Sequence, residues 1–189
     1  KLHVDPWINV VARANDEYVQ QQATLVRDTL DPDLTVYLEY TNEAWNTRGG
    51  QGSWIEQQGV AEWPASPEPP YTKRIVWYGK RTAQICDIWK TAWGAESDRV
   101  ICVMGAHARS LGTATTALDC PLWSQAPCSA HGIDAVGIAP YFGGYLGGSD
   151  NQAIVEAWTH EPDGGVDSLF EEITNGGLIP GGPAGGALQ

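Results

Sequence analysis

The residue pair Asn42-Glu43 follows the apolar run VYLEYT and precedes Trp45. A glutamate at the end of a buried strand costs desolvation free energy unless it is hydrogen-bonded or has a function. Partial burial beside Tyr40 and Trp45 would favour the neutral form of Glu43, which a carboxylic acid needs in order to donate a proton near neutral pH. The alternative is that Glu43 only caps the loop or forms an ion pair. The chemistry that this position offers is general acid–base catalysis.

Other candidate groups also lie in or after apolar runs. His107 ends the run RVICVMGAH, Tyr141 follows GIDAVGIAP, and Trp7 lies in LHVDPWINV. The chain has nine Trp and seven Tyr against two Phe, and indole and phenol rings combine a flat apolar face with a polar edge that suits stacking on sugars. Each single ring can instead fill the core, and a lone histidine can be structural. As a set, the aromatic residues favour carbohydrate binding.

Strands and helices that alternate along the chain must position these residues. The predicted strands are 2–10, 34–41, 99–107 and 132–142, and the predicted helices are 15–30, 71–93 and 166–175. Residues 46–70 are predicted to form a long loop, and a further loop carries residues 120–128. Apolar strands that alternate with helices indicate a parallel sheet built from βαβ units. The predicted fold class is therefore α/β.

Two α/β architectures fit this alternation, a doubly wound sheet and a (β/α)8 (TIM) barrel. Neither G-x-G-x-x-G nor G-x-x-x-x-G-K-[ST] follows a predicted strand, so the nucleotide-binding form of the doubly wound sheet has little support. In a barrel, the carboxyl ends of the strands line the active site. Asn42, Glu43, His107 and Tyr141 all lie at such ends, which favours the barrel.

Composition and charge exclude several classes of partner. The net charge is −12 and Lys and Arg do not cluster, so we expect no nucleic-acid partner, whereas a neutral substrate is compatible. No apolar run reaches the roughly eighteen residues of a membrane helix. The four histidines lack H-E-x-x-H or a similar spacing. We therefore expect no membrane association, no metal and no cofactor, and the oligomeric state stays open.

The chain has four cysteines, none in a C-x-x-C pair, which argues against zinc or redox chemistry. Cys120 and Cys128 bracket the short loop CPLWSQAPC and are predicted to form a disulfide. Cys86 and Cys102, on a predicted helix and a predicted strand, are equally compatible with buried free thiols. An oxidising compartment is favoured, and with it a secreted or periplasmic protein.

The stretch YTNEAWN after an apolar strand resembles the Asn-Glu signature that ends the fourth strand of the clan A glycoside hydrolases. The wider succession of DPWINV, a helix, VYLEYTNEAWN and the later IAPYFGG is similar to the barrel domain of secreted bacterial cellulose-binding or glycosidase-like proteins. The resemblance covers about residues 2–145. It implies a retaining enzyme with a (β/α)8 barrel that acts on a plant or microbial polysaccharide.

The resemblance also implies roles for individual residues. Glu43 would be the general acid/base, and Asn42 would form a hydrogen bond with the sugar 2-hydroxyl. Tyr141 matches the aromatic residue that ends the sixth strand and orients the nucleophile. Further substrate contacts would come from Trp45, Trp7 and His107.

One part of the family pattern is missing from this chain. A retaining mechanism needs a second carboxylate about 5–5.5 Å from the first, and in this clan it ends the seventh strand. No predicted strand after Tyr141 ends in Glu, and a complete barrel of this type typically has about 250 residues. We therefore expect an internal segment of a longer protein. Residues 1–175 would supply about strands three to six, residues 176–189 a Gly/Pro-rich flexible tail or linker, and the nucleophile would lie outside this chain.

Two other functions fit the same residues. A barrel without a catalytic pair would bind carbohydrate without cleaving it. An incomplete barrel would instead serve as a structural or assembly protein if its open sheet edges were buried against other chains. Glycoside hydrolysis is the first hypothesis because it gives Asn42 and Glu43 a role.

Overall fold

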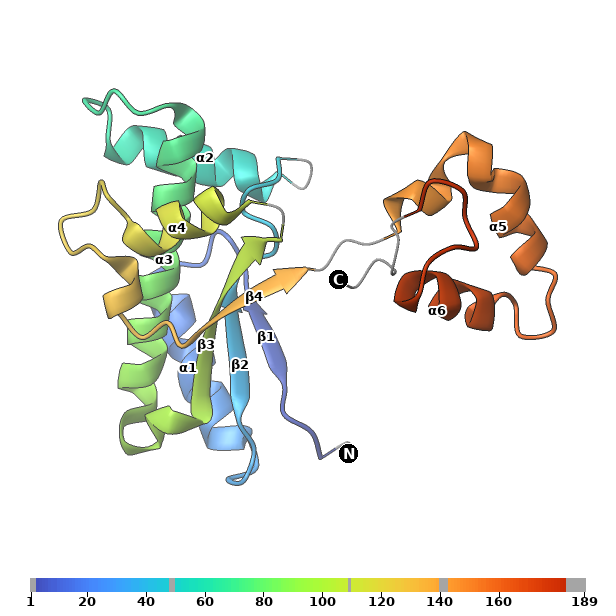
Figure 1. The fold of residues 1–189 in the computed structure, drawn as a ribbon. Coiled ribbons are helices and arrows are strands. Elements are labelled where there is room, and N and C mark those ends of the chain that lie inside the picture. Colours follow the sequence, from blue (N-terminus) through green and yellow to red (C-terminus); the bar gives the residue numbers. More distant parts are fainter. Residues whose placement is uncertain (1–2, 48–49, 109, 140–142, 183–189) are drawn as a thin grey trace. The chain divides into compact units, whose positions relative to one another are not determined.

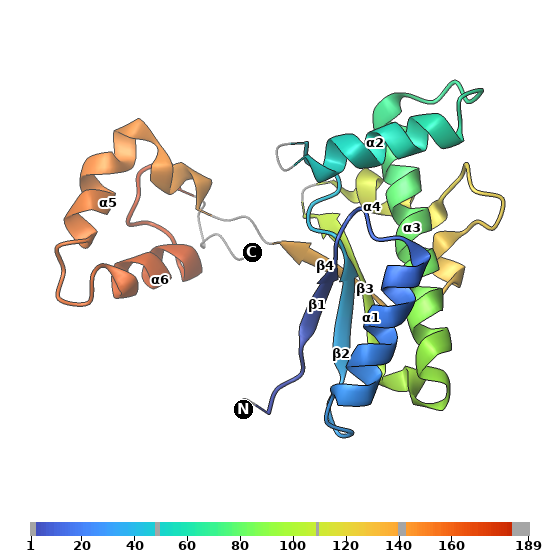
Figure 2. The same ribbon diagram turned by 180° about the vertical axis from the view of Figure 1, so that it is seen from behind.

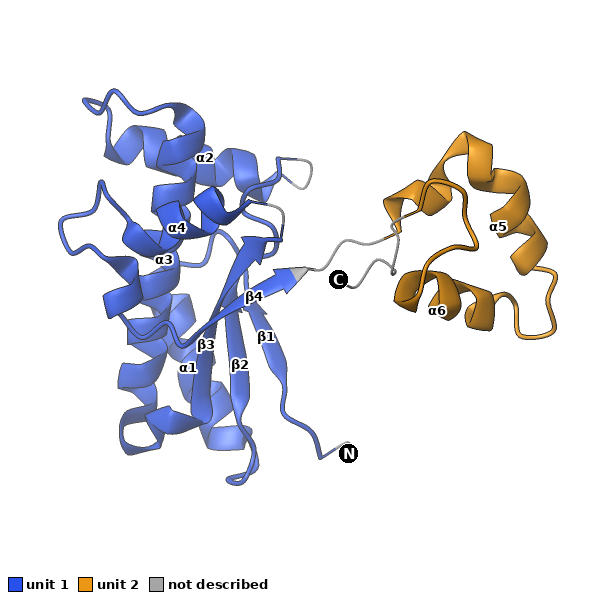
Figure 3. Cartoon of the chain, in the orientation of Figure 1, with its two compact units in different colours: residues 1–139 blue, residues 140–189 orange. Residues whose placement is uncertain are grey.

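The computed structural model describes residues 3–47, 50–108, 110–139 and 143–182. The chain divides into two compact units, Lys1–Ala139 and Pro140–Gln189 (Figure 3). The sequence predicted one domain over residues 1–175 and a tail from residue 176. The division falls earlier, at the end of the last strand, because the helices that follow pack against each other.

Unit 1 contains a parallel sheet with the strand order β1-β2-β3-β4 (Figure 1). The strands are β1 (Trp7–Val10), β2 (Val36–Tyr40), β3 (Val100–His107) and β4 (Ala135–Ala139). Glu39 lies opposite Val103, and Gly105 lies opposite Gly137. The predicted α/β class with a parallel sheet is confirmed. A closed (β/α)8 barrel is not shown, because the described residues form a sheet of four strands.

The described part of unit 1 adds a layer of helices to this sheet. They are α1 (Asp16–Thr29), α2 (Gln51–Glu62), α3 (Pro70–Trp93) and α4 (Leu111–Asp119), with the 3-10 turns η1 (Gly94–Arg99) and η2 (Cys128–Ala130). Helix α1 begins after Asn15, whose side chain accepts a hydrogen bond from the Tyr18 amide at 2.9 Å. Figures 1 and 2 show α1 and α3 lying along one face of the sheet.

The core lies between that face of the sheet and helices α1 and α3. In β2, Val36, Leu38 and Tyr40 are buried, whereas Tyr37 and Glu39 are half-buried. Because side chains alternate along a strand, Tyr37 and Glu39 project from the face away from the helices. In α3, residues at helical spacing form a stripe that is buried along its whole length: Ile75, Gly79, Ala83, Cys86, Trp89 and Trp93.

Two helices of unit 1 differ from the prediction. Helix α2 lies within residues 46–70, which were predicted to be a loop, and α4 lies between β3 and β4, where no helix was predicted. The buried residues of α2 are Gly52, Ile55 and Gly59, and two glycines give no signal to a search for large apolar residues at helical spacing. A Cβ on Gly52 would lie 2.0 Å from the Asn46 carbonyl oxygen. The glycine therefore lets α2 approach the loop that follows β2.

Both pairs of cysteines form disulfides. The Cys120–Cys128 bond closes the short loop as predicted. The Cys86–Cys102 bond joins α3 to β3 within the core. The sequence had left open whether these two cysteines are free thiols or a disulfide. Two disulfides are consistent with an oxidising compartment. None of the helices in the described ranges is long and apolar enough to cross a membrane.

The described part of unit 2, residues 143–182, consists of helices and turns. These are η3 (Gly144–Gly147), η4 (Ser149–Asn151), α5 (Gln152–Trp158) and α6 (Val166–Thr174), and α6 matches the helix predicted at residues 166–175. Glu172 on α6 is fully buried, and its Oε2 accepts hydrogen bonds from the amides of Leu178 at 2.7 Å and Ile179 at 3.1 Å. The first part of the predicted flexible tail is thus tied to α6, and residues 183–189 lie outside the described residues.

Candidate functional site

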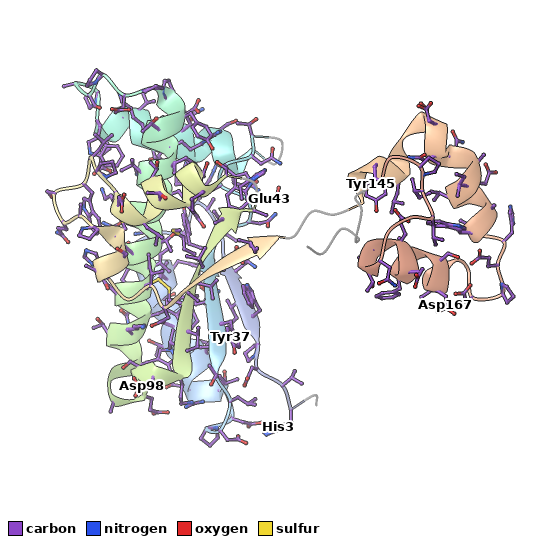
Figure 4. All side chains as sticks on the ribbon, in the orientation of Figure 1. His3, Tyr37, Glu43, Asp98, Tyr145 and Asp167 are labelled. Carbon is purple, nitrogen blue, oxygen red and sulfur yellow. A yellow bond between two sulfur atoms is a disulfide. The ribbon has the colours of Figure 1, made fainter. Side chains whose placement is uncertain are left out.

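A cavity of about 170 Å³ lies over residues of the sheet and extends to the loop at the carboxyl end of β2. It is lined by Trp7, Glu39, Asn42, Glu43, Trp45, Gly105, Gly137 and Ile138. All four strands contribute, either directly or through the loop that follows β2. In Figure 4, Glu43 lies near the ends of the strands, and Tyr37 lies farther back along β2.

The loop after β2 holds Glu43 in an unusual backbone conformation. Thr41 and Glu43 both have a φ of 47°, in the left-handed region that residues other than glycine seldom adopt. The Thr41 amide donates to the Val10 carbonyl at 3.0 Å, and the Asn46 amide donates to the Glu43 carbonyl at 2.8 Å. Asn46 Nδ2 also donates to Glu43 Oε2 at 3.1 Å. Backbone strain of this kind gathers at functional sites and persists where surrounding bonds impose it.

Side chains from α2 and α3 brace the same loop. Gln51 Nε2 donates to the Asn42 carbonyl at 3.1 Å, and Arg74 Nη2 donates to the Trp45 carbonyl at 2.9 Å. Arg74 is only 4% exposed, and its guanidinium carbon lies 4.7 Å from the centroid of the Tyr71 ring. A buried cation is costly to leave without partners, so the bond to Trp45 restrains the loop strongly.

Trp45 forms one wall of the cavity. Its ring meets the ring of His107 edge-on, with the centroids 5.9 Å apart and an interplanar angle of 78°. His107 is the last residue of β3. In the described structure it therefore supports the wall through Trp45 rather than lining the cavity itself.

Trp7 and Glu39 form a hydrogen-bonded pair in the cavity. Trp7 Nε1 donates to Glu39 Oε2 at 2.9 Å, and the indole stacks on Tyr37 with centroids 5.5 Å apart and planes 10° from parallel. Burial raises the pKa of the Glu39 carboxyl, and the hydrogen bond from Trp7 partly offsets that shift. Trp7 remains 53% exposed, so its indole is held in place and still accessible.

Two glycines make room for this pair. A Cβ on Gly105 would lie 2.6 Å from Glu39 Oε1, closer than real side chains approach. A Cβ on Gly137 would lie 2.9 Å from Val103 Cγ1 and 3.9 Å from the Trp7 ring. The two glycines are partners across β3 and β4. Side chains at these positions would occupy the space that the cavity uses.

The structure brings together four of the predicted site residues, namely Trp7, Asn42, Glu43 and Trp45. His107 contacts one of them, Trp45. Tyr141 lies outside the described residues, so its predicted role is not tested.

Glu39 lines the cavity but was not predicted as a site residue. The sequence did carry a signal for Glu39, because this ionisable residue lies inside a strand whose alternate positions are apolar. The other three lining residues that were missed, Gly105, Gly137 and Ile138, carried no such signal. They are at the cavity only because β3 and β4 lie beside β2.

No known protein-family model, curated protein or solved structure matches this chain. Across the described ranges, no group of three or more His, Cys, Asp and Glu side chains is placed to hold a metal ion. The cavity brings together two carboxyl groups, one amide and two indoles. Such a set suits a small ligand that combines hydroxyl groups with an apolar face.

Proposed function

We propose that this is a retaining glycoside hydrolase-like protein that acts on a plant or microbial polysaccharide, with Glu43 as the general acid/base. The observation that supports this most directly is that Asn42 and Glu43 share one cavity with two indole rings. Indole faces stack on sugar rings, while amide and carboxyl groups exchange hydrogen bonds with sugar hydroxyls. The resemblance of YTNEAWN to the clan A signature points to the same chemistry.

The sheet supports a barrel-type arrangement around this cavity. Its parallel strands follow one another in chain order, and α1 and α3 lie along one face. A doubly wound sheet reverses its strand order and carries helices on both faces, whereas a barrel keeps chain order with its helices outside. The proposal is that β1 to β4 correspond to about strands three to six of a (β/α)8 barrel, with β2 as the fourth.

In the proposed reaction, Glu43 protonates the glycosidic oxygen as the bond breaks and later takes a proton from the attacking water. Asn42 forms a hydrogen bond with the sugar 2-hydroxyl, which strengthens in the transition state. Asn46 Nδ2, which donates to Glu43 Oε2 at 3.1 Å, orients the carboxyl group. The restrained turn thus holds the proton donor in place before substrate binds.

The nucleophile is a separate element of the proposal. A retaining reaction needs a second carboxylate about 5–5.5 Å from the acid/base. Glu39 shares the cavity, but it lies on β2 only four residues before Glu43, which is in the loop after that strand, and Trp7 occupies its Oε2. We do not assign it this role, and a nucleophile outside this chain stays a prediction.

Hydrolysis of unactivated oligosaccharides by the full-length protein tests the role of Glu43, because their poor leaving groups require a proton donor. Glu43→Gln keeps the shape of the side chain but cannot transfer a proton, so kcat should fall by about 10²–10⁴-fold. Glu68→Gln is the control, since Glu68 is an exposed glutamate outside the cavity, and it should leave kcat unchanged. Equal, measurable rates with and without Glu43→Gln would overturn the proposal.

Non-catalytic carbohydrate binding is the second candidate function. The observation in its favour is that both carboxyl groups of the cavity come from β2 and the loop after it, whereas the resemblance implies a pair from two strands. Retained polysaccharide binding, with negligible hydrolysis by both the unchanged protein and Glu43→Gln, would favour binding over catalysis.

A further inference from the structure

We propose that Glu39 determines which sugars the cavity accepts: its Oε1 receives a hydrogen bond from a hydroxyl of a neutral sugar ring lying against Trp7, and its charge rejects acidic sugars. The inference rests on the proposed carbohydrate function and deepens it by naming the substrate class. Glu39 has a binding role here, distinct from proton transfer by Glu43.

The two oxygens of Glu39 have different surroundings. Oε2 accepts the hydrogen bond from Trp7 Nε1 at 2.9 Å. Among the described residues, the Glu39 carboxyl group makes no other hydrogen bond. Oε1 lies beside Gly105, at a place where even a methyl group would come within 2.6 Å. A carboxylate only accepts hydrogen bonds, so the remaining oxygen selects a ligand that donates, as a sugar hydroxyl does.

Trp7 supplies the surface on which the ring of such a sugar lies. One face of its indole is stacked on Tyr37, and its Nε1 is held by Glu39. The side chain is nevertheless 53% exposed. An aromatic ring that is held before the ligand arrives loses little conformational entropy on binding, which favours affinity. The hydrogen-bond acceptor and the stacking surface therefore belong to one preformed unit.

The charge of the cavity decides between neutral and acidic sugars. Both Glu39 and Glu43 line it, and none of the described lining residues is Lys or Arg. A uronate carboxylate that entered this space would lose its hydration without gaining a cation, next to two groups that carry negative charge when ionised. Repulsive elements of this kind discriminate against a competing ligand as effectively as new contacts favour the preferred one.

The size of the cavity limits how much of the substrate it takes. Its volume is about 170 Å³, whereas pockets for drug-sized ligands occupy roughly 300–1,000 Å³. One sugar ring is therefore the expected occupant of this part of the site. The glycines at positions 105 and 137 preserve that volume, because side chains there would meet Glu39 and Val103.

Two substitutions of Glu39 distinguish the effect of its hydrogen-bonding group from the effect of its negative charge. In Glu39→Gln, the amide oxygen can serve Trp7 while the NH₂ group faces the cavity, so the charge is lost but a polar contact with a hydroxyl remains. In Glu39→Leu, both the charge and the polar contact are lost. Glu68→Gln again serves as the control for removal of a carboxylate outside the cavity.

The experiment measures dissociation constants by calorimetry for the full-length protein and these variants. The probes are two matched pairs, glucose with glucuronate oligosaccharides and galactose with galacturonate oligosaccharides. The unchanged protein should bind at least one neutral member and bind its acidic counterpart about tenfold or more weakly. Glu39→Gln should stay within about threefold for the neutral sugar and gain about tenfold for the acidic one, while Glu39→Leu should lose about tenfold or more for the neutral sugar.

The outcomes separate this inference from the proposed function. If the unchanged protein binds neutral sugars but both Glu39 variants keep its affinities and its discrimination, the inference is overturned while the carbohydrate function stands. If the unchanged protein binds no probe, both are overturned. Glu39→Gln is close in shape to the native side chain, so its gain for acidic sugars remains a decisive readout even if Glu39→Leu fails to fold.

Discussion

Glu39 in unit 1 and Glu172 in unit 2 are both withdrawn from water, yet their carboxyl groups are used differently. Glu172 is fully buried, and its Oε2 accepts hydrogen bonds from two backbone amides at 2.7 and 3.1 Å. Glu39 is half-buried and receives its hydrogen bond from the side chain of Trp7. A carboxylate oxygen that accepts bonds from nearby backbone amides ties segments of the fold together, whereas a carboxylate with an acceptor beside a cavity is available to a ligand.

A glycine lies next to the second oxygen of each glutamate. A Cβ on Gly182 would lie 2.5 Å from Glu172 Oε1, and a Cβ on Gly105 would lie 2.6 Å from Glu39 Oε1. Glu172 Oε1 is buried without a hydrogen-bond partner in the described structure. Nearby, burial raises the pKa of Tyr145, and the Glu172 carboxylate raises it further. In both units a glycine therefore lies close to a glutamate oxygen. In unit 2 that oxygen is buried, whereas in unit 1 it lies beside the cavity.

The largest expected effect is a loss of stability, and it tests the structural role of Glu172. Glu172→Ala removes the acceptor for the amides of Leu178 and Ile179 and leaves a buried gap, so unit 2 should lose about 2–4 kcal/mol of stability. Amide hydrogen exchange should show lost protection at residues 178 and 179 and unchanged protection in unit 1. Glu171→Ala, at an exposed neighbouring position on α6, is the control.

Removal of Glu39 provides the matching measurement in unit 1. Because Glu39 is only half-buried and its hydrogen bond is with the exposed indole of Trp7, Glu39→Ala should change the stability of unit 1 by less than about 1 kcal/mol. The comparison breaks if this variant destabilises unit 1 as much as Glu172→Ala destabilises unit 2, or if residues 178 and 179 keep their protection in Glu172→Ala.

A smaller effect is expected from filling the cavity. In Gly105→Ala the added methyl group would displace Glu39 Oε1, which lies 2.6 Å from the Cβ position. Affinity for the sugar that binds best should fall about tenfold, as expected when a polar contact is lost. Gly112→Ala on α4 is the matched control, because nothing lies within 4 Å of its Cβ position. Equal affinities for the two variants would show that Glu39 Oε1 does not face the ligand.

The smallest effect concerns His131, whose two ring nitrogens, unlike the oxygens of the two glutamates, both have a partner. Its Nδ1 lies 2.7 Å from Asp87 Oδ2, and its Nε2 donates to the Gln125 carbonyl at 3.0 Å. Burial lowers the pKa of His131, but the bonds to Gln125 and Asp87 outweigh it and raise the pKa above 6.5. Stabilisation from His131 is therefore complete below about pH 6.5, its ordinary value, and is lost as the pH rises through the folded-state pKa.

Denaturant unfolding between about pH 5.5 and 8 measures this contribution. The unfolding free energy of the unchanged protein should exceed that of His131→Gln at the acidic end, and the difference should shrink as the pH rises. The difference should stay below about 1 kcal/mol, since water screens these partly exposed groups. Fluorescence of Trp123, which stacks on His131 with centroids 4.7 Å apart, reports on this loop. A difference independent of pH would contradict the prediction.

Sequence patterns predicted the elements that bury large side chains at a regular spacing. The strand at Val36–Tyr40 was expected because β-branched and aromatic residues are concentrated there, and the long helix at Pro70–Trp93 because apolar residues recur with a period of about 3.6. Helix α2 was missed because two of its three buried residues are glycines. The division after Ala139 was also missed, because the Gly-rich segment that follows gives no sign of the packing of α5 and α6.

The same distinction between local sequence patterns and contacts between distant elements explains which site residues were predicted. Asn42, Glu43 and Trp45 were found because they are neighbours in sequence at the end of a strand, and parallel strands end at a common edge. Glu39 was missed because a glutamate within a strand marks a half-exposed position, and only the neighbouring strands show that this position lines a cavity. Its surroundings depend on Trp7 from β1 and Gly105 from β3.

By itself, the sequence determined the α/β class, the main strands, the Cys120–Cys128 disulfide and the position of Asn42-Glu43 at a strand end. These features depend on local periodicity and short spacings. Only the tertiary structure decided three further features. These are the Cys86–Cys102 bond, the hydrogen bond from Arg74 to the Trp45 carbonyl, and the position of Trp7, Glu39 and Glu43 around one cavity. Each of these contacts joins elements that are distant along the chain, and their distance in space depends on how the strands pair and how the helices pack.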